Sequence, residues 1–225
     1  MAKRRPQRSY APSTKLRNGL FRLCGQAPEH GGNLWLVHST RNHQQWIING
    51  DLKFLHFLYL EFEPSVLGFE IRPAAVAATI DEVTEHVTFD AVVRFTDGRT
   101  ECRMVGTSEH TPQQDLAASR CGGVTQLVSV DDLYPVRNRI LNGLRMNRFL
   151  TAARHHPLEA DCNAVLVSLK RSQAAVTLEE LCTRLHHIHA AFAQAAVFRL
   201  YQLRRVDLDL NAGPLHRHSL VGIRQ

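Results

Sequence analysis

Apolar and polar side chains alternate between His86 and Gly106, and this alternation predicts a pair of β-strands. Asp90 and Arg94 fall on the more polar face of the first strand. The dipeptide Asp97-Gly98 is typical of a tight turn, so we expect a second strand directly after it. The side chains expected to face the core from the first strand are Phe89, Ala91, Val93 and Phe95.

The register of this hairpin depends on the length of its turn. A two-residue turn places Asp90 opposite Val105 and Arg94 opposite Glu101. A three-residue turn places Asp90 opposite Met104 instead. Side chains that lie directly opposite each other interact, so the register decides which charged groups can form a pair.

The pattern on both sides of the hairpin predicts strands interleaved with helices. Apolar residues recur at helical spacing from 51 to 62, with Asp51 as the expected N-cap and Pro64 just beyond the helix end. The other predicted elements are strands at 33–39, 66–73 and 124–130, a loop with at most one helical turn at 107–123, and a helix broken near Pro135 at 131–154. This order favours a mixed α/β fold, with a mixed sheet flanked by helices.

After Pro157 the pattern changes to short helices followed by two strands. Thr177 and Glu180 form a capping-box pattern at the start of the second helix. The predicted elements are helices at 160–170, 177–187 and 190–204, and strands at 207–210 and 219–223. Three helices and a hairpin favour a small winged-helix-like domain, and a plain helical accessory domain is the alternative. We therefore expect a basic flexible arm at 1–30, an α/β domain at 31–155 and a C-terminal domain at 156–225.

Composition and charge limit the kinds of function that the protein can have. The 225 residues are 44% hydrophobic, as in a globular protein, and their net charge of +6 favours a polyanionic partner such as DNA. No apolar run approaches the roughly 20 residues needed to span a bilayer, and no secretory signal is evident. Five scattered cysteines without a C-x-x-C pair favour reduced thiols and a cytoplasmic location.

The N-terminal 28 residues contain basic side chains and no acidic ones. This segment is either a solvated tail or an arm that lies along phosphates and releases counterions. A second basic group follows the last predicted helix. The side chains expected to contact DNA are Lys3, Arg4, Arg5, Arg8, Lys15, Arg17, Arg204 and Arg205.

Histidines gather at 155–156, 186–189 and 216–218. His186 and His189 lie one helical turn apart, a spacing that metal sites use. No Cys or carboxylate stands at a supporting spacing, so we expect surface histidines that add positive charge when protonated. No signature of Ser-His-Asp or Cys-His catalysis and no glycine-rich phosphate loop is present.

Five segments, taken in order, resemble the TnsA-type endonuclease subunit of heteromeric transposases. They are LEFEPSVLGFEIRP (60–73), TFDAVVRFTDGR (88–99), LVSVDDL (127–133), VRNRILNGLRMNRFL (136–150) and FRLYQLRRVDLDLNAGPLHRHSLV (198–221). The resemblance implies a restriction-endonuclease-like N-terminal domain, a winged C-terminal domain and a partner transposase or regulator. It also implies Mg²⁺-dependent strand cutting, in which carboxylates hold the ion and a lysine neutralises developing charge.

Carried over by position, three of the family's four catalytic groups are absent. The aspartate is present as Asp90, whereas the helical glutamate falls on Lys53. On the second strand the glutamate or glutamine falls on Met104 and the lysine on Gly106. The resemblance therefore implies a nuclease fold with a degenerate active site and no confident metal ligand set.

Three nearby residues are possible substitutes for the missing groups, namely Glu101, Arg103 and Asp51. With the two-residue turn, Glu101 lies about 13 Å along the strand from Asp90 at ~3.3 Å per residue, too far to share one ion. Asp90 is then expected to pair with Arg103, and Arg94 with Glu101.

Three hypotheses for the function remain open. The first is a TnsA-like subunit that binds DNA and a partner transposase or regulator with weak or no endonuclease activity. The second is an active Mg²⁺-dependent endonuclease with relocated ligands. The third is a free-standing DNA-binding protein that uses the same fold.

Overall fold

A four-stranded mixed sheet lies at the centre of the N-terminal part of the chain. The computed structural model describes residues 33–107, 109–172 and 174–224. The strand order is β3-β6-β7-β8, with antiparallel pairs except for the parallel pair β7 and β8. The strands are β3 (Val66–Ile71), β6 (Ala91–Phe95), β7 (Thr100–Val105) and β8 (Val124–Val128).

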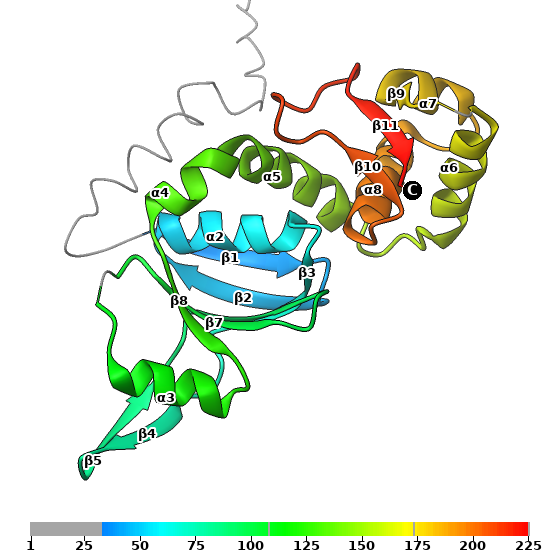
Figure 1. The fold of residues 1–225 in the computed structure, drawn as a ribbon. Helices are drawn as coiled ribbons and strands as arrows, with labels where there is room; N and C mark the ends of the chain where they lie inside the picture. The colour runs from blue at the N-terminus through cyan, green and yellow to red at the C-terminus, as the bar shows by residue number, and fades with distance from the viewer. Residues whose placement is uncertain (1–32, 108, 173, 225) are drawn as a thin grey trace, which may run out of the picture.

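Helices cover both faces of this sheet. Helix α2 (Asp51–Phe62) packs its apolar side chains against Ala91 and Val93 on one face. Helix α3 (Pro112–Arg120) packs on the other, where Cys102 joins Ala117 in a smaller cluster. The fold is therefore mixed α/β with a mixed sheet flanked by helices, as the sequence predicts (Figure 1).

Two hairpins extend the central layer. β1 (Leu34–Ser39) and β2 (Gln44–Asn49) pair in an antiparallel sheet below α2 (Figure 1). Trp35 of this hairpin stacks on Phe54 of α2, with ring centroids 4.0 Å apart. β4 (Val76–Ile80) and β5 (Val83–Val87) form the second hairpin next to α3.

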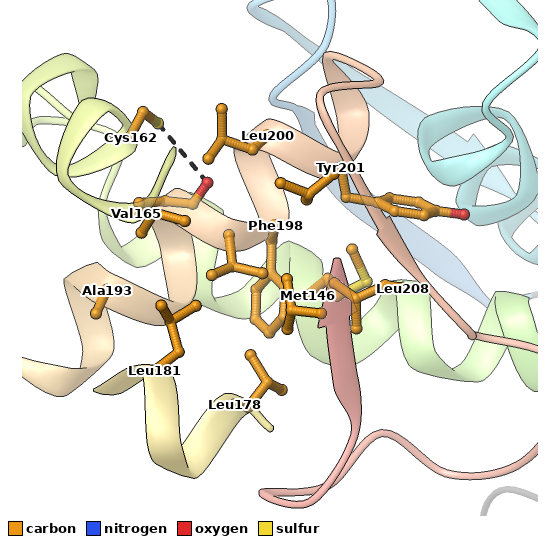
Figure 2. Close-up of a cluster of buried hydrophobic side chains, with 14 of the residues drawn as sticks. Met146, Cys162, Val165, Leu178, Leu181, Ala193, Phe198, Leu200, Tyr201 and Leu208 are labelled. Carbon is orange, nitrogen blue, oxygen red and sulfur yellow. Dashed lines mark hydrogen bonds between the residues drawn. The ribbon is translucent and has the colours of Figure 1, made fainter. Parts of the chain in front are cut away.

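The C-terminal part combines short helices with a small antiparallel sheet of order β10-β11-β9. Its elements are α6 (Glu159–Ser172), β9 (Val176–Thr177), α7 (Leu178–Arg184), α8 (Ala190–Gln202), β10 (Val206–Leu208) and β11 (Leu220–Ile223). Figure 2 shows its core, in which Phe198 of α8 lies among Leu178, Leu181 and Met146. The expected terminal hairpin is confirmed by the pairing of β10 with β11.

One long helix contributes to both cores. The 3₁₀ turn η1 (Tyr134–Val136), which contains Pro135, separates α4 (Val130–Leu133) from α5 (Arg137–Ala152) and confirms the predicted break. Ile140 of α5 packs in the N-terminal core, whereas Met146 and Leu150 pack in the C-terminal core. Helix α5 therefore connects the two parts along the chain and also contributes buried side chains to both of their cores.

Buried polar contacts also cross between the two parts. The Glu61 carboxylate at the end of α2 accepts hydrogen bonds from Thr40 and from Gln202 of α8, the latter at 2.9 Å. The Asn142 amide of α5 donates to the carbonyl oxygens of Leu210 and Gly213. These contacts hold the C-terminal segments against α2 and α5.

Several local predictions were wrong. β2 and the β4–β5 hairpin were missed, and the segment after β7 contains the nine-residue helix α3 rather than at most one turn. Thr111 and Gln114 form a complete capping box at the start of α3. Asp51 is not the N-cap of α2, because Gly50 occupies that position and Asp51 is the first helical residue.

The hairpin of β6 and β7 has the register of a three-residue turn. Ala91 lies opposite Arg103 and Val93 lies opposite Glu101. Continued by one residue, this register sets Asp90 opposite Met104, so the two-residue turn was wrong. Glu101 and Arg103 consequently share the α2 face of the sheet with the apolar positions of β6.

Two global properties follow from the described residues. Within them, no helix is long and apolar enough to cross a membrane. Their four cysteines are free thiols, namely Cys102, Cys121, Cys162 and Cys182.

Candidate functional site

Two of the four positions carried over from the family resemblance, Lys53 and Asp90, line one pocket of about 280 Å³, whereas Met104 and Gly106 do not line it. Its walls come from the first turns of α2, the end of β3 and the residues just before β6. Lys53, His56, Arg72 and Asp90 supply the charged and titratable groups of its lining. Among the described residues of this lining, Asp90 alone carries a carboxylate.

Backbone hydrogen bonds to both neighbouring strands fix Asp90. Its N–H donates to the carbonyl oxygen of Arg103 at 2.9 Å, and its own carbonyl oxygen accepts from the N–H of Arg72 at 3.0 Å. Its Oδ2 accepts from the backbone N–H of Val105 at 2.8 Å. These backbone hydrogen bonds alone are enough to hold the Asp90 carboxylate at the end of β7.

The second oxygen of Asp90 binds a lysine. The Nζ of Lys53 lies 2.5 Å from Oδ1 of Asp90. Lys53 belongs to the first turn of α2, near the positive end of the helix dipole, where a cation is unfavourable. Asp90 offsets that unfavourable placement, and the pair leaves both carboxylate oxygens occupied.

This donor set does not fit Mg²⁺. Mg²⁺ sites use one or two carboxylates together with water and phosphate oxygens. Here a divalent ion would have to displace the Lys53 ammonium from Asp90 and then remain beside it, which like charges oppose. The pocket therefore holds an internal ion pair at the position where the resemblance implies a metal.

The second strand supplies neither of the groups that the resemblance implies. Met104 packs its side chain against the cluster of Cys102 and Ala117. Gly106 lies beyond the end of β7, and its φ of +83° is a backbone conformation that side-chain-bearing residues rarely adopt. The position that should carry lysine therefore differs in backbone conformation as well as in side chain.

Glu101 and Arg103 form an ion pair inside the protein. Their relative exposures are 5% and 7%, and Arg103 Nη2 lies 2.7 Å from Glu101 Oε2. Arg99 pairs with the other oxygen of Glu101. Both expected ion pairs were therefore wrong, since Asp90 binds Lys53 and Glu101 binds Arg99 and Arg103.

A buried histidine completes this chain of contacts. Arg103 donates a hydrogen bond to Nε2 of His56 at 3.0 Å, so the Nδ1 atom carries the proton of the neutral ring. Burial, with a further contribution from the Arg103 charge, holds the pKa of His56 well below its usual value. The polar chain is thus a neutral imidazole, a guanidinium cation and a carboxylate, joined by hydrogen bonds through Arg103.

The third proposed substitute, Asp51, binds other residues than Asp90 or Lys53. Its carboxylate accepts hydrogen bonds from Trp35 Nε1 at 2.9 Å and from Asn33 Nδ2 at 3.0 Å. Asp51 is two residues from Lys53, about 200° around a helix with 3.6 residues per turn. Neither Asp51 nor Glu101 therefore adds a second carboxylate at Asp90.

The two described residues predicted to contact DNA, Arg204 and Arg205, are both exposed. The remaining predicted contacts, Lys3, Arg4, Arg5, Arg8, Lys15 and Arg17, lie outside the described residues. Two neighbouring residues on α8 make internal contacts instead, because Arg199 donates a hydrogen bond to the Thr40 carbonyl oxygen and Tyr201 is buried.

The histidine groups make separate contacts. His156 lies 2.8 Å from Asp161, and His218 lies 3.5 Å from Glu179. In the described part of the chain, no three His, Cys, Asp or Glu side chains are grouped so that they could hold a metal ion.

Comparisons with known proteins give no independent assignment. No family model matches the chain, and a search of curated proteins finds no match.

Proposed function

We propose that the chain is a TnsA-like subunit of a DNA transposition system, which binds DNA and a partner transposase or regulator and has weak or no endonuclease activity. The observation that carries the proposal is the contact between Lys53 and Asp90. It places a cationic side chain where the resemblance implies a metal-binding carboxylate.

The architecture supports this proposal. A mixed sheet with a buried helix on one face, and Asp90 just before a hairpin strand, is compatible with a restriction-endonuclease-like domain. The three C-terminal helices with the small β10-β11-β9 sheet are compatible with a winged helix. Since α8 is largely buried, the exposed residues Arg204 and Arg205 just beyond its end are the better candidates for phosphate contact.

Charge supports DNA as the partner. The net charge is +6, and seven basic side chains precede the first acidic one. Phosphate contacts of this kind are tolerant of sequence and weaken steeply with salt. We expect the fluorescence anisotropy of a labelled 30-base-pair duplex to report at least a tenfold weaker affinity when salt rises from about 50 to 200 mM. An affinity that is indifferent to salt would contradict the proposal.

Endonuclease activity is tested on a supercoiled plasmid and on a duplex that carries a transposon end. We expect no nicking above the buffer control with Mg²⁺ or Mn²⁺, either from the parent chain or from Asp90→Ala. Metal-dependent nicking that Asp90→Ala abolishes would overturn the proposal in favour of an active enzyme. Co-purification with a transposase subunit separates the proposal from a free-standing DNA-binding protein.

A further inference from the structure

A large cleft lies at the junction of the two parts of the chain. Its volume is about 720 Å³, within the range of roughly 300–1,000 Å³ that is typical of ligand sites. The turn between β1 and β2, the link between α5 and α6, and the end of α8 form its walls. The Asp90 pocket has no residue in common with it.

The charged groups of this junction cleft are strongly unbalanced. Arg154 and Arg205 line it, and within the described residues neither has an ion pair with a carboxylate. Arg199 also lines it and donates a hydrogen bond to the Thr40 carbonyl oxygen. Glu159 is the one acidic residue among the lining residues described. The chain's N-terminal 28 residues contain no acid, so they cannot supply the missing negative charge. An anionic group from another molecule is therefore the complement of this surface.

The floor of the junction cleft is apolar. Leu200 is buried at its base, whereas Leu203 is 52% exposed at the end of α8. The other aliphatic side chains of the floor and walls are Leu150, Ala153, Leu158 and Leu166. Exposed leucine inside a concave surface is typical of a position that a partner covers.

The combination favours a peptide over a nucleic acid. Phosphate contacts use cationic and polar groups presented along the backbone, and they gain nothing from an aliphatic floor. An acidic peptide uses both features, because an apolar side chain covers Leu203 and Leu200 while its carboxylates pair with the arginines.

We propose that the junction cleft binds an acidic peptide segment of a partner protein, anchored by an apolar side chain on Leu203 and by carboxylates at Arg154. This deepens the proposed function by naming the chemistry of the protein partner, and it rests on that function only in requiring such a partner. Both anchors are surface residues that are not part of either hydrophobic core.

The test is a selection of random 12-residue peptides displayed on phage against the full-length chain, followed by synthesis of the enriched peptides. We expect enrichment of peptides with at least two acidic residues beside an apolar one. Their affinity, measured by fluorescence anisotropy, should fall at least about tenfold in Arg154→Glu and in Leu203→Ser. Matched controls are Arg171→Glu and Leu220→Ser, which alter an exposed cation and an exposed leucine outside the cleft.

Each outcome decides between alternatives. Enrichment of no peptide, or of peptides without acidic residues, overturns the proposal, as does equal loss of affinity in the control variants. A loss of duplex-DNA affinity in Leu203→Ser would instead assign the cleft to nucleic acid. DNA affinity is measured separately with Arg204→Glu, which alters an exposed cation that does not line the cleft. Failure of DNA binding and failure of peptide binding are therefore distinguishable.

Discussion

The Nζ atom of Lys53 lies 2.5 Å from Oδ1 of Asp90, so a helix residue and a strand-end residue form one ion pair in the pocket beside α2. The side chain of Lys53 is 42% exposed and that of Asp90 is 17% exposed. Solvent screening limits the stabilisation from such a pair to about 1 kcal/mol or less. The chemical consequence is larger, because the lysine neutralises the carboxylate that a cation would otherwise bind.

Replacing this lysine with an acid should create sensitivity to divalent cations. In Lys53→Glu, two carboxylates face each other, so we expect a lower melting temperature than that of the parent in the presence of EDTA. Millimolar Mn²⁺ should raise it again, because an ion that binds only the folded state stabilises it. Differential scanning fluorimetry with EDTA and with Mn²⁺ measures both effects.

The control for this experiment is Lys53→Met, which removes the cation without adding an acid. The melting temperature of the parent should not respond to Mn²⁺, and that of Lys53→Met should respond less than that of Lys53→Glu, because Asp90 is then a single free carboxylate. A response of the parent equal to that of Lys53→Glu would mean that Lys53 does not block the site.

Removal of Arg103 should strongly destabilise the fold. Arg103→Met leaves Glu101 buried with Arg99 as its remaining cation, and breaking a buried pair typically costs about 3–5 kcal/mol. We expect a loss near 3 kcal/mol, since Arg99 still contacts Glu101. Urea unfolding followed by circular dichroism measures the change in the free energy of unfolding.

Arg94→Met is the matched control, because Arg94 is an exposed arginine on the neighbouring strand. It should change the free energy of unfolding by less than about 0.5 kcal/mol. Equal losses in the two variants would show that the buried pair has no special role in stability.

The buried imidazole of His56 should make the fold sensitive to acid. Its pKa in the folded state is well below 6.5, because burial disfavours the charged ring. Above about pH 6.5 the ring is neutral in both states, so it contributes no pH dependence. As the pH falls below that value the unfolded state takes up a proton that the folded state does not, and stability falls by at most about 1.4 kcal/mol per pH unit.

His56→Gln isolates this effect, since glutamine can accept the Arg103 hydrogen bond but does not titrate. Urea unfolding at a series of pH values from 5 to 8 should show a shallower decline below about pH 6.5 in this variant. Parallel curves for the parent and His56→Gln would contradict the prediction.

Close packing of α2 on α5 should make Gly143 intolerant of a side chain. A Cβ atom at this position would lie 2.7 Å from Cδ2 of Phe62. Gly143→Ala should therefore destabilise the fold by about 1–3 kcal/mol, although alanine favours helix formation. Thermal and urea unfolding measure the loss.

The double variant Phe62→Leu with Gly143→Ala tests the cause of that loss. If the clash with the phenyl ring is responsible, the two substitutions should cost less together than the sum of their separate effects. Additive losses would point to a different cause.

Local sequence patterns predicted those elements whose apolar spacing is regular. Helix α2 begins and ends where its leucine and phenylalanine spacing indicates, and the alternation from Phe89 to Phe95 is confirmed by burial of every second residue. The β4–β5 hairpin was missed because β5 is largely exposed, β4 has a single buried residue, and neither strand has a buried alternating face. The capping box at Thr111 and Gln114 was a usable signal for α3.

The candidate site was harder to predict because it depends on tertiary contacts. The positions of Lys53 and Asp90 were identified through the resemblance, but their contact requires α2 to lie across the sheet. Glu101 and Arg103 resemble surface residues in composition, and only the three-residue turn places them on the buried face. A one-residue change of register moves every side chain of a strand to the other face, which is why this error changed the predicted ion pairs.

The shared helix α5 also limits which exchanges of sequence the protein can accept. A C-terminal part taken from another protein would pack against Met146 and Leu150 on α5 and Phe62 on α2. Its own core would have to fit these three side chains, which belong to the N-terminal part. Recombination at Pro157 leaves residues 137–152 with the N-terminal part, so it would join two compatible halves only when the core of the new C-terminal part is adapted to them. The two parts of this chain are expected to diverge together.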